Sequence, residues 1–260
     1  MAKRAVRATA GVANAPSPGA PAASRFARLR RQLWRFFLWG LLALFLALLA
    51  WEASFYARIW WWIDHNPAST SFMDQRRSAL QAKQPGAQLK HQWVAYPRIS
   101  QNLKLAVIAA EDTSFVEHEG FDWKGIEKAL EKNQKKGKVV AGGSTITQQL
   151  AKNLFLSGER SYLRKGQEAL ITWMIESQMD KDRILEIYLN VVEWGNGVFG
   201  VEAAAQHYFG VSAARLSREQ AARLAAMLPR PQFYDSNRNS AYLAGRVPVL
   251  LKRMNQVEAP

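Results

Sequence analysis

The stretch that decides the fold is QNLKLAVIAAEDTSFVEHEG, residues 101–120. Its first half is rich in alanine and leucine, has no glycine or proline, and spaces its apolar residues as a helix does. It therefore predicts a buried helix over 101–110. This helix delivers two adjacent acids, Glu111 and Asp112, to its C-terminal end, where the helix macrodipole disfavours negative charge. Two explanations stay open: the acids pair with a nearby Lys or Arg, or one carboxylate has a raised proton affinity and can accept a proton.

A second stretch, GGSTITQQLAKNLF at 142–155, predicts a loop that turns into a helix. Thr145 and Gln148 have the spacing of a capping box, which places the start of the helix there. Apolar residues fall on one face, at Ile146, Leu150 and Leu154, and a polar stripe falls on the other, at Thr145, Gln148, Gln149 and Lys152. Because neutral polar groups are costly to bury without partners, the stripe faces either bulk water or a polar cleft suited to a sugar.

Charged residues follow at Arg160, Arg164, Lys165 and Glu168. The segment 161–179 predicts a helix with Leu163, Leu170 and Met174 on one side and with Arg164 and Glu168, four residues apart, on another. One interpretation is an ordinary ion pair within the helix, worth about 0.3–0.5 kcal/mol. The other is a cationic cluster around an anionic leaving group, in which Glu168 holds an arginine or a divalent cation.

The other helical stretches are interpreted mainly as scaffold. The lysine-rich face of 123–138 is either solvated or in contact with anionic headgroups or phosphate. Residues 183–190 predict a helix, 194–200 a glycine-rich turn and 201–210 another helix, and the chain after Gly210 is expected to contribute packing. His118 and His207 lack the defined spacing of metal ligands.

The N-terminal part predicts a membrane anchor. The chain has 260 residues and a formal charge of +14, and eight basic residues precede its first acid, Glu52. We expect residues 1–32 to be a basic disordered tail, 33–55 a transmembrane helix, and 56–98 an interfacial segment and linker with a short helix over 71–82. The positive charges flank only the N-terminal side, so the N-terminus is expected in the cytoplasm. A cleaved signal peptide is the alternative, which the long apolar run and the sequence AWEAS disfavour.

Several classes of site are excluded. The absence of cysteine excludes disulfides, thiolate metal sites and a cysteine nucleophile. Lys138 follows Gly137 but precedes Val139, where a P-loop requires serine or threonine, so nucleotide binding is not expected.

Taken together, five segments resemble the five ordered motifs of glycosyltransferase family 51, the peptidoglycan glycosyltransferases. They are EDTSFVEHEG at 111–120, GGSTITQQLAKN at 142–153, RKGQE at 164–168, ILEIYLN at 184–190 and GVFGVEAA at 197–204. The resemblance implies a mainly α fold, with a lysozyme-like glycosyltransferase domain over 99–260 preceded by one transmembrane helix. The chain has no Ser-x-x-Lys, the nucleophile motif of penicillin-binding transpeptidases, which favours a monofunctional enzyme without a second domain.

The resemblance also implies roles for single residues. Glu111 matches the family's base, and Glu168 resembles its second essential acid, placed at the pyrophosphate with or without Mg²⁺ or Mn²⁺. Candidates to neutralise the leaving pyrophosphate are Lys152, Arg160 and Arg164. The expected substrate-binding set further includes Asp112 and Asn153, together with the residues expected to orient sugar and phosphate oxygens, Ser144, Thr145, Gln148 and Gln149.

The implied substrate is lipid II, polymerised into β-1,4 glycan on the outer face of the cytoplasmic membrane. Expected partners are lipid II, the growing glycan chain, membrane lipids and proteins of cell-wall synthesis or division, and not nucleic acid. The catalytic domain is expected in the periplasm, behind a single span of the inner membrane. Two other classes stay open: a membrane-anchored lytic enzyme that cleaves peptidoglycan, and a non-catalytic scaffold for cell-wall synthesis.

Overall fold

The computed structural model describes residues 22–138, 142–156, 158 and 161–260 and confirms the mainly α fold. It forms two compact units, one up to Ala53 and one over Ser54–Pro260. The predicted disordered segment before Ala22 and one candidate site residue, Arg160, lie outside the described residues.

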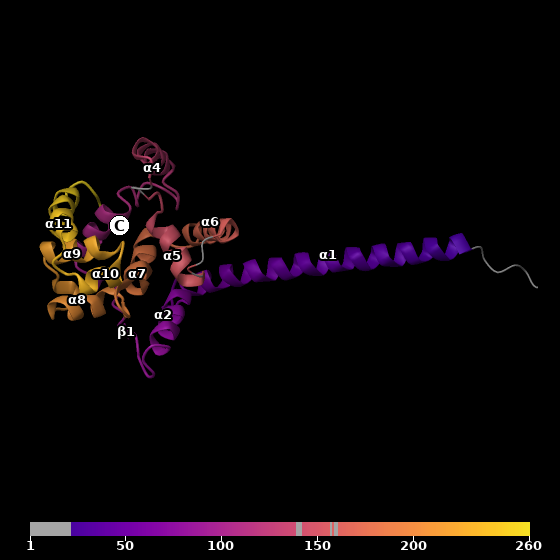
Figure 1. Cartoon of the computed structure of the whole chain (residues 1–260), viewed down its shortest axis with the longest axis horizontal. Coiled ribbons are helices and arrows are strands. Elements are labelled where there is room, and N and C mark those ends of the chain that lie inside the picture. Colours follow the sequence, from indigo (N-terminus) through magenta and orange to yellow (C-terminus); the bar gives the residue numbers. More distant parts are fainter. Residues whose placement is uncertain (1–21, 139–141, 157, 159–160) are drawn as a thin grey trace, which may run out of the picture. The chain divides into compact units, whose positions relative to one another are not determined.

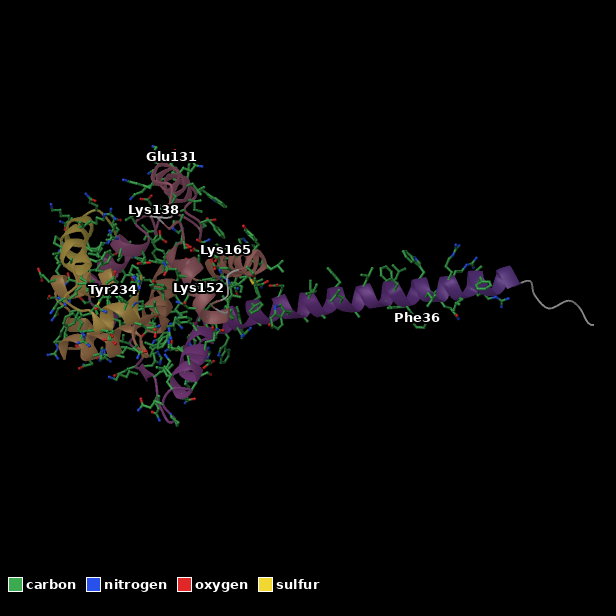
Figure 2. The ribbon with its side chains drawn as sticks, in the orientation of Figure 1. Phe36, Glu131, Lys138, Lys152, Lys165 and Tyr234 are labelled. Carbon is green, nitrogen blue, oxygen red and sulfur yellow. The ribbon has the colours of Figure 1, made fainter. Side chains whose placement is uncertain are left out.

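The first unit consists of α1 (Ala22–Trp61) up to Ala53. The helix over 26–61 is long enough to cross a membrane and contains an apolar stretch of sufficient length, and the side chains of that stretch are not buried by protein. Figure 2 shows one of them, Phe36, projecting from the helix. The helix begins eleven residues before the expected position, Leu33. The reason is that 22–32 consists largely of Ala, Arg, Leu and Gln, all good helix formers, so the helix continues beyond the apolar run.

The end of α1 belongs to the second unit. Phe55 and Ile59 are buried in its core. The guanidinium of Arg58 lies over the rings of Phe55 and Phe155, 5.0 and 4.8 Å from their centroids. Arg183 donates to the backbone oxygens of Trp62 and His65 just after the helix ends.

The second unit contains the other helices, shown in Figure 1. These are α2 (Ser71–Gln81), α3 (Gln101–Glu111), α4 (Trp123–Lys136), α5 (Ile146–Phe155), α6 (Tyr162–Glu176), α7 (Lys181–Val191), α8 (Val201–Phe209), α9 (Arg218–Met227), α10 (Pro231–Ser236) and α11 (Ala241–Arg253), with 3₁₀ turns at Tyr96–Arg98 and Ala213–Arg215. Helix α7 packs against both α5 and α8, while α3 packs against α9 and α11. Nearly every residue of α7 from Ile184 to Val191 is buried, so α7 forms the centre of the core.

A small sheet combines one strand from before α3 with two strands from after α7. Its strands are β1 (Lys90–His91), β2 (Glu193–Gly195) and β3 (Val198–Phe199), in the order β1-β3-β2, with β1 parallel and β2 antiparallel to β3. The sequence predicted only a turn at this position. Gly197 has a φ of +71°, which a glycine adopts without strain and which permits the tight connection between β2 and β3.

Residues 56–98, expected as an interfacial segment and linker, are part of the same compact unit as 99–260. Helix α2 packs on α5, and β1 pairs with β3. The side chain of Asn190 clamps the backbone of Val94, accepting from its N–H at 2.8 Å and donating to its carbonyl at 2.9 Å. These contacts join residues about a hundred positions apart, which local composition does not reveal.

Candidate functional site

Helix α3 ends at Glu111, as the sequence predicted, and five of its apolar residues are buried in the core. This packing holds Glu111 at the edge of a cavity. Burial raises the pKa of Glu111 above the ordinary value of a glutamate. The hydrogen bond from Gln149 and the positive charges of Arg246 and Lys152 oppose this rise, whereas Asp112 adds to it. A half-buried carboxyl with a raised pKa fits the second explanation for the paired acids, a proton acceptor.

Asp112 has a different environment, although it is the next residue. One carboxylate oxygen lies 3.0 Å from Nε2 of His118, and the other accepts from the N–H of Ile146 at 3.0 Å, at the start of α5. The N–H of Gly120 donates to Nδ1 of His118, so the ring proton lies on Nε2 and is donated to Asp112. Asp112 therefore joins three segments of the fold, and its expected place in the substrate-binding set stays a prediction.

The capping box at the start of α5 is confirmed. Thr145 accepts from the N–H of Gln148, and Gln148 accepts from the N–H of Thr145. The hydroxyl of Thr145 also donates to the carbonyl of Gly120 at 2.7 Å. Thr145, Gln148 and Asn153 are buried, whereas Ser144 is exposed. The members of the polar stripe therefore differ: Thr145 and Gln148 are buried and hold the start of α5, whereas Gln149 and Lys152 are only partly buried.

Gln149 connects Glu111 to the core. Its Nε2 donates to Oε2 of Glu111 at 2.8 Å, and its Oε1 accepts from the hydroxyl of Tyr188 at 3.0 Å. Tyr188 lies on α7 and is fully buried, and burial raises its pKa well above the ordinary value. The hydroxyl therefore stays protonated and acts as the donor.

A cationic cluster lies where α5 and α6 are adjacent, in the region of Lys152 and Lys165 in Figure 2. Arg164 binds one oxygen of buried Glu168 at 2.7 Å, and Lys165 binds the other. Burial lowers the pKa of Lys152, and the negative charges of Glu168 and Glu111 partly offset this. The ammonium of Lys152 forms no salt bridge within the described ranges, and the buried Nε of Arg164 has no hydrogen-bond partner there. Of the cations in this cluster, Lys152 is therefore the one that the described residues leave without a salt bridge.

The residues of this cluster fit a divalent cation poorly. Both oxygens of Glu168 are bound by cations. No group of three or more His, Asp or Glu that could hold a metal occurs in the part of the chain that the structure describes. The prediction of Mg²⁺ or Mn²⁺ at Glu168 stays a prediction, and no step of the reaction below depends on it.

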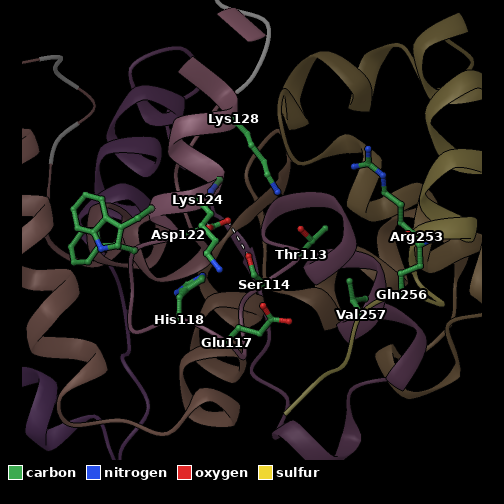
Figure 3. Close-up of a pocket in the computed structure, with 13 residues that line it drawn as sticks. Thr113, Ser114, Glu117, His118, Asp122, Lys124, Lys128, Arg253, Gln256 and Val257 are labelled. Carbon is green, nitrogen blue, oxygen red and sulfur yellow. Dashed lines mark hydrogen bonds between the residues drawn. The ribbon is translucent and has the colours of Figure 1, made fainter. Parts of the chain in front are cut away.

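Two adjoining cavities lie near Glu111, and no described residue of the cationic cluster lines either of them. The first, of about 210 Å³, is lined by Glu111, Ser144 and the turn at Gly142 and Gly143. The second, of about 630 Å³, shares Thr113, Asp122, Gly125 and Arg253 with the first. Figure 3 shows Lys128 of α4 reaching into this second cavity and Arg253 of α11 on its opposite wall. Both carboxylate oxygens of Asp122 already accept hydrogen bonds, one from the hydroxyl of Ser114 at 2.9 Å and the other from the N–H of Gly125 at 2.8 Å.

Sequence reasoning missed three residues of this region. Tyr188 was assigned to scaffold, and Arg246 and Arg253 lie after Gly210, in the part expected to contribute only packing. In addition to packing, Arg246 donates to the carbonyl of Ala110 at 3.4 Å and acts on the charge of Glu111, and Arg253 lines both cavities. The sequence does show that Arg246 and Arg253 lie on one amphipathic helix. It does not show that this helix lies beside Glu111.

The helix predicted over 161–179 is present as α6, and the three apolar residues expected on one side of it differ in burial. Met174 is buried, but Leu163 is 89% exposed and Leu170 also faces outward. The first turns of α6 extend beyond the core, so helical spacing there does not report burial.

Comparison with known proteins gives a consistent result. The family described as Transglycosylase matches residues 77–255. The chain is 64% identical over 222 residues to a biosynthetic peptidoglycan transglycosylase of Herminiimonas arsenicoxydans, covering 85% of this chain and 96% of the relative. Proteins of the same name from Thiobacillus denitrificans and Methylobacillus flagellatus are 57% and 56% identical, covering 88% and 89% of this chain and 99% and 100% of the relatives.

Proposed function

The chain belongs to the transglycosylase family and is a peptidoglycan glycosyltransferase, and we propose that it polymerises lipid II by a single displacement between Glu111 and the cationic cluster at Lys152. The observation that carries this proposal is that Glu111 lines a cavity and also lies within electrostatic reach of Lys152.

On the cavity side, Glu111 acts as the base. The acceptor hydroxyl of lipid II is a weak nucleophile, so it needs a group that takes its proton as the new bond forms. The raised pKa of Glu111 makes this carboxylate a stronger base than an exposed glutamate. Attack on an α-linked sugar from the face opposite the leaving group gives the β linkage, through an oxocarbenium-like transition state.

On the cluster side, Lys152 and Arg164 neutralise the departing pyrophosphate. Pyrophosphate is weakly basic, so it requires positive charge more than a proton. Glu168 orients Arg164 and Lys165 by binding both of them. Arg160, which adjoins this region in sequence, is proposed as a third cation.

Incubation with labelled lipid II and, separately, with preformed sacculi distinguishes the three candidate classes. A polymerase consumes lipid II and releases undecaprenyl diphosphate, and it leaves sacculi intact. A lytic enzyme would release muropeptides from sacculi, and a scaffold would do neither. Muropeptide release without consumption of lipid II would overturn the proposal.

The two cavities are proposed to hold the incoming lipid II, whose anionic groups suit Lys128 and Arg253. Lys128→Ala is expected to raise KM for lipid II by about two- to fivefold and to leave kcat within about twofold, because one exposed charge contributes weakly. Lys135→Ala is the matched control, since Lys135 lies on the same helix, is paired with Glu131 and does not line the cavity. Steady-state kinetics of both variants test this point. If Lys128→Ala and Lys135→Ala have the same KM for lipid II, the acceptor does not bind in this cavity.

The apolar helix α1 fits a membrane anchor. We further propose that the N-terminus is cytoplasmic and that the second unit lies in the periplasm, with cell-wall synthesis proteins as partners. The mature protein is then expected to begin at its encoded N-terminus and to stay in the membrane fraction after high-salt washing. N-terminal sequencing of the fractions is the measurement, and soluble protein beginning near Ser54 would contradict an uncleaved anchor.

A further inference from the structure

We propose that Tyr188 and Gln149 are positioning residues that hold the carboxylate of Glu111 ionised and in place at the cavity that it lines. The inference rests on the proposed function, in which Glu111 takes the acceptor proton. It concerns a hydrogen-bonded chain that runs from the hydroxyl of Tyr188 through the side-chain amide of Gln149 to Oε2 of Glu111.

The direction of this chain follows from the donors. The Tyr188 hydroxyl is buried and needs an acceptor for its proton, and among the described residues the carbonyl oxygen of the Gln149 amide is its one acceptor. With that oxygen engaged, the amide must present its NH₂ group to Glu111. The opposite amide orientation would place a carbonyl oxygen against the carboxylate and leave the Tyr188 proton unpaired. Both contacts therefore select the same orientation.

This orientation favours the ionised carboxylate. A donor at 2.8 Å stabilises negative charge on Glu111, whereas burial and neighbouring Asp112 disfavour it. Arg246 of α11 and Lys152 of α5 act in the same direction as Gln149. If Tyr188 is lost, the amide is free to turn, the pKa of Glu111 rises further, and the base is protonated at a higher pH.

The test compares the pH dependence of kcat for Tyr188→Phe with that of the wild-type chain. Tyr188→Phe keeps the ring in the core and removes one hydroxyl that does not reach substrate. Turnover on the acid side should fall by about three- to tenfold, and the high-pH plateau should stay within about twofold, because the base is still present and ionises there. KM should not change.

Tyr208→Phe is the matched control, because its hydroxyl also donates one hydrogen bond, to the carbonyl of Trp194 at 2.9 Å, but lies outside the Glu111 chain. Gln149→Glu is the second variant: it keeps the shape, replaces the donor by an acceptor and should shift the acid limb to higher pH more strongly. A uniform loss at all pH values in Tyr188→Phe, or an unshifted acid limb in both variants, overturns the inference. An inactive wild-type chain would instead overturn the proposed function.

Discussion

Glu111→Gln is expected to reduce the turnover of lipid II by about 10²-fold or more, because the amide cannot accept the proton of the attacking hydroxyl. The geometry should survive, since the new side chain has the same length and its oxygen can still accept from Nε2 of Gln149. Binding of lipid II should therefore be retained. Single-turnover kinetics with labelled lipid II measure the chemical step without interference from product release.

Stability provides an internal control for this variant. The pKa of Glu111 is raised in the folded chain, so ionising this carboxyl costs stability above its unfolded pKa. At neutral pH, Glu111→Gln should therefore melt at the same or a higher temperature than the wild-type chain, and the difference should vanish in acid. Near-normal turnover by a well-folded variant would move the base elsewhere. Asp112 would be a poor replacement, because both of its oxygens are bound by protein groups.

Lys152→Ala is expected to have the other large effect, a loss of about 10²- to 10³-fold in kcat/KM. A cation that meets charge developing on the pyrophosphate contributes about 3–4 kcal/mol to the transition state in sites of this kind. The free energy of folding should hardly change. Burial lowers the pKa of Lys152, so the charge of this side chain contributes little to the stability of the free enzyme. Parallel measurements of melting temperature and lipid II turnover separate the two contributions.

Arg77→Ala is the control for loss of a positive charge as such. Arg77 forms a surface ion pair with Asp74 at 2.9 Å on α2, and its removal should cost at most about 1 kcal/mol of stability without changing turnover. Arg164→Lys tests the other member of the cluster, because it keeps the charge but loses the planar fork that binds Glu168. If Lys152→Ala turned over lipid II as fast as Arg77→Ala, the leaving-group assignment would fail.

The sequence predicted the elements whose signals are local. The helix that ends at Glu111 and the capping box of Thr145 and Gln148 follow from propensity and spacing, and both are present. Two explanations were open for the adjacent acids, a raised proton affinity and a paired carboxylate, and each of the two acids fits a different one. Glu111 has the raised pKa, while Asp112 is bound by His118 and a backbone N–H in place of the expected Lys or Arg.

Contacts between distant segments could not be predicted in this way. Helical spacing shows that Tyr188 and Arg246 lie on amphipathic helices, but not that α7 and α11 bring them to Gln149 and Glu111. The same limit explains residues 56–98, whose polar composition resembles a linker although Asn190 and β3 hold them in the fold.

The most direct test of the account is the anomeric configuration of the linkage that the full-length chain forms from lipid II. Displacement by an acceptor that Glu111 activates, opposite a pyrophosphate held at Lys152, inverts the α-linked donor. Nuclear magnetic resonance of the purified product should therefore show a β-1,4 polymer that a muramidase digests. An α-linked polymer, or a hydrolysed disaccharide without polymer, would contradict the arrangement of base and leaving group described above.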